Sequence, residues 1–115
     1  MAIYRITPVP APRMTRADKW KKRGCVLRYR AFRDLVKLNG VTIPEHGAEI
    51  VFHLPMPGGW SLKKINSHKG QPHQQKPDLD NLLKALLDAV FADDCRIWSY
   101  RAEKRWAMAG AIEIG

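Results

Sequence analysis

The stretch KPDLDNLLKALLDAVFADD, residues 76–94, constrains the possible folds more than any other part of the chain. Its large apolar residues recur at the spacing of a helix that buries one face: Leu79, Leu82, Leu83, Leu86, Leu87 and Val90. The same stretch holds five of the eleven acidic residues of a chain whose formal net charge is +9. We predict a helix that begins near Asp78, packs on the core and keeps its carboxylates on another face.

The polar side of this helix admits two interpretations. Asp78 fits an N-cap, and Lys84 lies four residues from both Asp80 and Asp88, as in ordinary helix ion pairs. However, Asp78 and Asp80 place two carboxylates within one turn, where their mutual repulsion is costly unless a cation offsets it. The pair therefore also suits a cation site.

A second acidic pair, Asp93 and Asp94, precedes the next predicted strand. A short link back from the helix would bring the start of that strand close to Asp78 and Asp80. Three converging carboxylates form a site for a hard cation, Mg²⁺ or Mn²⁺. Beside a surface that binds nucleic acid, such a site indicates phosphodiester hydrolysis.

The basic residues are clustered. Ten of the twenty Lys and Arg residues fall between Arg13 and Lys37, which is typical of a surface that binds a polyanion, and nucleic acid is the expected partner. The alternative is a solvated helix face joined to a mobile basic loop. The candidate contacts to a DNA backbone are Arg13, Arg16, Lys19, Lys21, Lys22 and Arg23, with Arg30, Arg33 and Lys37 on one face of the following helix.

The order of elements predicts one small domain over residues 1–115. We expect strands at 2–8, 48–57, within 95–106 and at 107–115, helices at 26–39 and from Asp78, and a proline-marked basic loop at 9–24. The first helix would bury Leu27, Ala31, Leu35 and Leu38 and end at Gly40. This β-α-β-α-β-β order predicts an α/β domain of the α+β type, with a mixed sheet and two helices packed on it.

Residues 57–76 form a second predicted loop, without periodicity and rich in Gly, Lys, Gln and His. Its candidate DNA contacts are Lys63, Lys64, Lys69 and Lys76, with Trp60 stacking on a base. A mobile surface loop without function is the equal alternative. His68 and His73 lie five residues apart with no cysteine nearby, which does not match a zinc site.

Cys25 and Cys95 show the spacing of neither a disulfide framework nor a metal site. The start, MAIYRITPVP, lacks the apolar centre of a signal peptide, and no apolar run approaches the roughly 20 residues that cross a bilayer. We therefore expect reduced cysteines and a cytoplasmic protein without membrane contact or a small-molecule cofactor.

The motif KPDLDNLLKALLDAV, followed by DD and then by a strand that contains EKRW, resembles the RusA family of Holliday-junction resolvases, found in bacteria and prophages. The resemblance implies a homodimeric, Mg²⁺- or Mn²⁺-dependent endodeoxyribonuclease that cuts four-way DNA junctions symmetrically in recombination and repair. By position, Asp78, Asp80 and Asp94 match the family's metal-binding aspartates, and Lys84 matches its catalytic lysine. The link at 89–92 is shorter than in the family, so Asp93 is the alternative third ligand.

Three other functions fit the same residues. A non-catalytic DNA- or RNA-binding module would use the acids only as a cap, a helix ion pair and a turn. A nuclease for flap or other branched DNA would share the metal chemistry but not the paired cleavage. A structural or regulatory phage protein would carry a degenerate site, although every expected acidic position and the lysine are occupied.

Overall fold

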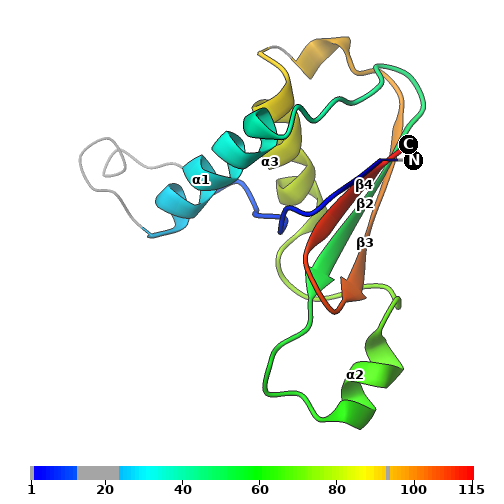
Figure 1. Cartoon of the computed structure of the whole chain (residues 1–115). Coiled ribbons are helices and arrows are strands. Elements are labelled where there is room, and N and C mark those ends of the chain that lie inside the picture. The colour runs from blue at the N-terminus through cyan, green and yellow to red at the C-terminus, as the bar shows by residue number, and fades with distance from the viewer. Residues whose placement is uncertain (1, 13–23, 93) are drawn as a thin grey trace.

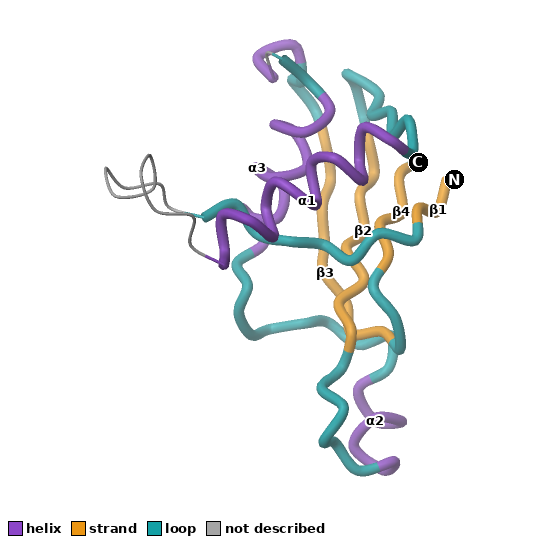
Figure 2. Tube along the Cα trace, turned by 60° about the vertical axis from the view of Figure 1, so that its left-hand side comes forward, coloured by secondary structure: helices purple, strands orange, loops and turns teal. Residues whose placement is uncertain are grey.

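The computed structural model describes residues 2–12, 24–92 and 94–115. Four strands form one sheet in the order β1-β4-β2-β3, with β1 at Ala2–Tyr4, β2 at Ala48–Pro55, β3 at Tyr100–Ala107 and β4 at Ala111–Ile114. Figure 2 shows this order, with β4 and β2 in the middle of the sheet. The edge strand β3 is parallel to β2, and both pairings of β4 are antiparallel. The predicted mixed sheet is therefore confirmed.

Two helices lie side by side on one face of this sheet, α1 (Gly24–Leu38) and α3 (Leu79–Val90) (Figure 1). A short helix, α2 (Leu62–His68), extends beyond the ends of the strands, and a 3₁₀ turn, η2 (Asp94–Arg96), follows α3. The core fills the space between the helices and the sheet, where Phe32, Phe52 and Leu86 are fully buried. No described helix is long and apolar enough to span a bilayer.

The helix at the centre of the sequence motif packs as its spacing predicts. Leu82, Leu83, Leu86 and Leu87 are buried, and Leu79 and Val90 pack against the core from its margin. Each buried leucine contributes about 1.5–3 kcal/mol relative to exposure. The polar residues of α3 are thereby left on the outside.

The sequence prediction chose the wrong buried face for the first helix. Leu27 and Leu35 are half-exposed and Leu38 is 83% exposed, whereas α1 buries Val26, Tyr29, Phe32 and Val36. Both sets recur at helical spacing, and the set with two aromatic rings removes more area from water when it packs against α3. The leucines, with Ala31, therefore form an exposed apolar stripe.

Three further boundaries differ from the prediction. The first strand ends at Tyr4, well before residue 8, and the strand expected within 95–106 begins only at Tyr100. The segment expected to be an irregular loop contains α2, so the described chain has a third helix. Ser61 begins α2 as an N-cap, accepting a hydrogen bond from Lys64 N at 3.3 Å.

The connection between β3 and β4 presses on the N-terminal segment at one point. A Cβ on Gly110 would lie 2.7 Å from Cα of Thr7, closer than packed atoms tolerate. A side chain therefore has no room at residue 110, and the chain after β1 packs directly on this connection.

Candidate active site at the start of α3

The chain that leads into α3 is fastened along β3. Gly70 N donates to Trp106 O at 2.9 Å, Trp106 N donates to Gln71 O at 3.0 Å, and His73 N donates to Lys104 O at 3.0 Å. These bonds extend the sheet by a short irregular edge. The approach to α3 is therefore held by backbone hydrogen bonds rather than left as a free loop.

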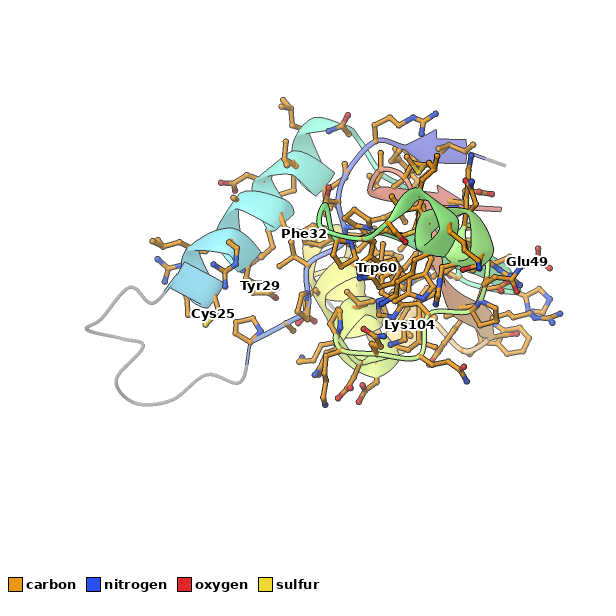
Figure 3. All side chains as sticks on the ribbon, turned by 90° about the horizontal axis from the view of Figure 1, so that it is seen from below. Cys25, Tyr29, Phe32, Glu49, Trp60 and Lys104 are labelled. Carbon is orange, nitrogen blue, oxygen red and sulfur yellow. The ribbon has the colours of Figure 1, made fainter. Side chains whose placement is uncertain are left out.

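Lys104 completes this attachment from the core-facing side of β3. Its Nζ donates to Gln75 O at 2.5 Å and to Pro77 O at 2.7 Å. Pro77 follows a cis peptide bond and immediately precedes Asp78, the N-cap of α3. Seen from below in Figure 3, Lys104 lies near the start of α3. A half-buried ammonium thus fixes the point at which the acidic motif begins.

Asp78 and Asp80 are both available at the helix start. Asp78 is the N-cap residue, but its side chain makes no capping hydrogen bond; it accepts from Lys76 Nζ at 2.9 and 3.1 Å and is 48% exposed. Asp80 Oδ1 accepts from Asn81 N at 3.0 Å, and Asp80 is exposed. The N-terminus of a helix favours nearby anions, which partly offsets the repulsion between the two carboxylates.

Lys84 lies one turn further along the polar face. Its Nζ is 3.1 Å from Asp88 Oδ2, and the same oxygen accepts from Tyr29 OH of α1 at 3.4 Å. Burial, and then the charge of Asp88, raises the pKa of Tyr29, so its hydroxyl stays protonated at neutral pH. Asp88 therefore joins the two helices and holds Lys84 on the polar side of α3.

Asp94 lies beyond the other end of α3. The twelve residues of α3 span about 18 Å, and η2 begins after its C-terminus, at the top of Figure 1. Because β3 runs back antiparallel to α3, the end of that strand, not its beginning, returns to Asp78. The backbone therefore does not bring Asp94 to Asp78 and Asp80 within one chain; Asp93 lies outside the described residues.

The family comparison agrees with this motif. The family model described as Endodeoxyribonuclease RusA matches residues 6–115, nearly the whole chain. The chain belongs to the RusA family. It is thus an endodeoxyribonuclease of the Holliday-junction-resolvase type, which acts on branched DNA. No curated protein and no solved structure matches the chain significantly.

The proline-rich segment of this RusA-family chain crosses the polar side of α3. Ala11 N donates to Asn81 O at 3.0 Å, and Ala11, Pro12, Asn81 and Lys84 line a hollow of about 230 Å³. Pro12 is the last described residue before the basic segment. The predicted DNA contacts of that segment, which are Arg13, Arg16, Lys19, Lys21, Lys22 and Arg23, lie outside the described residues.

A second basic surface lies on α1. Arg30, Arg33 and Lys37 line one hollow together with Asp34, so the prediction that they share a face is confirmed. The guanidinium of Arg33 also lies 5.8 Å from the ring centre of Tyr29. Tyr29 links this surface to the acidic motif. The contact of the surface with DNA remains a prediction.

Trp60 attaches α2 to the sheet. Its ring centroid lies 4.8 Å from those of His68 and Trp106, and Lys64 Nζ is 4.3 Å from the ring centre (Figure 3). These contacts occupy the indole within the chain. Lys63, Lys64 and Lys69 are exposed on or beside α2 and remain predicted DNA contacts.

The described residues contain no group of three His, Cys, Asp or Glu side chains placed to hold a metal ion. Asp78 and Asp80 nevertheless suit Mg²⁺ or Mn²⁺, because such ions often bind through one or two carboxylates, water and substrate phosphate. Asp78 makes no capping bond, Asp80 accepts from one first-turn amide through Oδ1, and both side chains are exposed. The residues present therefore fit the cofactor that the motif implies.

The sequence predictions missed Lys104. It occupies the same strand face as Ala102 and Trp106, which both contact the interior. A lysine in phase with core residues indicates a half-buried side chain whose ammonium needs partners, and this signal was present in the sequence.

Proposed function

We propose that this RusA-family chain resolves four-way DNA junctions by metal-dependent, paired and symmetric strand cleavage. The observation that carries the proposal is the exposed pair of Asp78 and Asp80 at the start of α3, where Lys104 holds the backbone and both carboxylates lie outside the core. Basic residues on α1 and in the N-terminal segment supply the attraction for a polyanion.

In this mechanism Asp78 and Asp80 hold Mg²⁺ or Mn²⁺. When bound, the metal lowers the pKa of a water molecule and offsets charge on the scissile phosphate. Lys84, on the same helix face, neutralises the charge that develops on the phosphate oxygens, while Asp88 keeps its ammonium in position. Attack by water on phosphorus expels the 3′-oxygen and leaves a 5′-phosphate and a 3′-hydroxyl.

We propose that Asp94 completes the metal site only in a homodimer. Within one chain it stands at the far end of α3, so we assign its carboxylate to the site of a second copy. The exposed stripe of Leu27, Leu35 and Leu38 offers apolar area for the contact between copies. A two-fold dimer also presents two equivalent sites to a nearly two-fold junction.

Junction recognition then rests on shape and on contacts to phosphates. Such contacts set the register of a protein on DNA and carry no base information. The proposed contacts are Arg13, Arg16, Lys19, Lys21, Lys22, Arg23, Arg30, Arg33, Lys63, Lys64, Lys69 and Lys76. Their number predicts binding that weakens steeply as salt concentration rises.

The deciding experiment compares the unaltered protein with Asp80→Asn on a synthetic four-way junction, a flap and a linear duplex. We expect paired symmetric cuts in the junction with Mg²⁺ or Mn²⁺, and junction binding without cleavage by Asp80→Asn. Asp34→Asn, on the basic surface of α1, is the matched control and should still cut. Junction binding without cleavage by the unaltered protein would favour the non-catalytic module, and preferred cleavage of the flap would favour the branched-DNA nuclease.

A further inference from the structure

A groove of about 470 Å³ opens beside the start of α3. Its lining comes from five parts of the chain and is largely apolar, with Val9, Pro10, Leu54, Pro55, Pro77 and Trp106. Volumes of a few hundred Å³ with apolar walls and a few polar groups are typical of sites for small ligands. The indole of Trp106 and the proline rings offer surfaces on which a planar ring can stack.

Cationic and amide groups also border the groove. Arg28 of α1 and Lys76 contribute to its lining, together with Gln75. A neutral apolar ligand would gain nothing from these charges, whereas a ring joined to a phosphate would satisfy both the walls and the cations. Charge complementarity therefore favours a nucleotide as the occupant.

His73 adds a neutral ring to the same lining. It is only 5% exposed, and its ring centroid lies 4.1 Å from that of Trp106. Burial, and then the charge of Lys104, lowers the pKa of His73, so the imidazole is neutral. Its Nδ1 is closed off from solvent, so the imidazole contributes to the groove as a ring beside Trp106 and not through this nitrogen.

The groove and the acidic motif share one loop. Lys76 and Pro77 line the groove, and Lys76 Nζ contacts the carboxylate of Asp78 at 2.9 Å. A DNA strand whose phosphate reaches Asp78 would therefore pass its neighbouring nucleotide over the groove. Unpairing a base costs least where pairing is already interrupted, as at a branch point.

We propose that this groove holds one unstacked nucleobase of the strand being cut, next to the scissile phosphate. The inference rests on the proposed function, because it places the base relative to a phosphate at Asp78. Stacking on the groove walls would make cleavage depend on the base at one position. The enzyme would then read junction shape through its cations and one nucleotide through this groove.

The test is a scan with abasic junctions, each lacking one base near the cut. For the unaltered protein, we expect removal of one base within two nucleotides of the cut to slow cleavage by about tenfold, the scale of a lost base-stacking contact. Two variants that fill the groove from different sides, Val9→Trp and Pro57→Trp, should lose this position dependence. Leu62→Trp, an exposed residue of α2, is the matched control and should keep it.

Measurements of junction binding distinguish the groove proposal from the proposed nuclease function. Asp80→Asn should bind the sensitive abasic junction more weakly than the intact one, whether or not the unaltered protein cleaves. Equal effects at all abasic positions, or the same position dependence in both filled variants, would overturn the groove proposal. Absence of cleavage by the unaltered protein, with position-dependent binding retained, would instead overturn the nuclease mechanism and leave the groove in place.

Discussion

The two ends of α3 both carry acidic residues, but they are held in different ways. At its start, the backbone of residues 70–77 is fixed along β3 and by the half-buried Lys104. Beyond its end, η2 is held by an exposed ion pair between Arg96 and Glu45, at 2.7 Å, and by the stacking of Trp98 on His46, at 4.3 Å. Exposed ion pairs contribute little to stability, whereas half-buried bonds to backbone oxygens fix geometry. The start of α3 is therefore the end built for positional accuracy.

The strongest test of this difference substitutes one aspartate at each end of α3 and measures junction cleavage in the same assay. Asp80→Asn and Asp94→Asn should each reduce junction cleavage by about a thousandfold, the upper range for losing a group that stabilises transition-state charge. If Asp94 serves the site of a second copy, an equal mixture of the two variants forms heterodimers with one intact site. Random pairing should then restore about a quarter of the active sites.

Single-strand nicking of the junction is the measurement for this mixture. The double variant with both substitutions in one chain, mixed with the unaltered protein, is the control for subunit exchange. No recovery, despite demonstrated exchange, would show that Asp94 does not act between copies.

Lys104→Met should give the next largest effect. Without its ammonium, the carbonyls of Gln75 and Pro77 lose their partner, and the start of α3 can shift. We expect cleavage to fall by about a hundredfold, a loss typical of small misplacements at a reacting centre. The Mn²⁺ concentration for half-maximal activity should also rise, whereas junction binding should change less than twofold.

Arg101→Met, at an exposed position of β3 outside the proposed DNA contacts, is the matched control for the loss of one positive charge. Calorimetric Mn²⁺ binding to the folded variant distinguishes a displaced site from general unfolding. Unchanged metal affinity in Lys104→Met would contradict a positioning role for this residue.

The pH dependence of stability should report on His73. Because its pKa is lowered in the folded state, the unfolded chain binds more protons as the pH falls below about 6.5. The stability that neutral His73 provides is present above that pH and is lost progressively below it. Urea unfolding at pH 8 and pH 5 should show a smaller difference for His73→Gln, and an equal difference would contradict this assignment.

The smallest effect is expected at the far end of α3. Glu45→Gln removes the partner of Arg96, whose pKa the Glu45 carboxylate raises through a hydrogen bond and its charge. Since both groups are exposed, neither Tm nor the rate of junction cleavage should change measurably. A clear loss of cleavage would mean that η2 needs more accurate placement than its contacts suggest.

The sequence predicted α3 well because it has one dominant apolar stripe, bounded by Pro77 and by the acidic pair after Val90. It misassigned α1 because Leu27 and Leu35 recur as regularly as Tyr29 and Phe32, and only packing against α3 distinguishes the two sets. Local periodicity cannot choose between equivalent stripes when the partner surface is unknown.

The polar side of α3 was predictable from the sequence, whereas the position of Asp94 was not. Asp80, Lys84 and Asp88 recur every four residues outside the apolar stripe, as the spacing predicts, and their roles remain predictions. The expected return of Asp94 depended on the direction of a strand. An antiparallel return after a twelve-residue helix leaves the following residues at the far end. Long-range direction of this kind is set by sheet pairing, here the parallel register of β3 with β2.

The close approach of Gly110 to Thr7 has a mechanical consequence. Residues 7–10 line the groove, and a side chain at residue 110 would collide with Thr7 of this segment. Any substitution of Gly110 would therefore displace part of the groove lining. The connection between β3 and β4 thus helps to set the width of the groove, although Gly110 itself is not part of the lining.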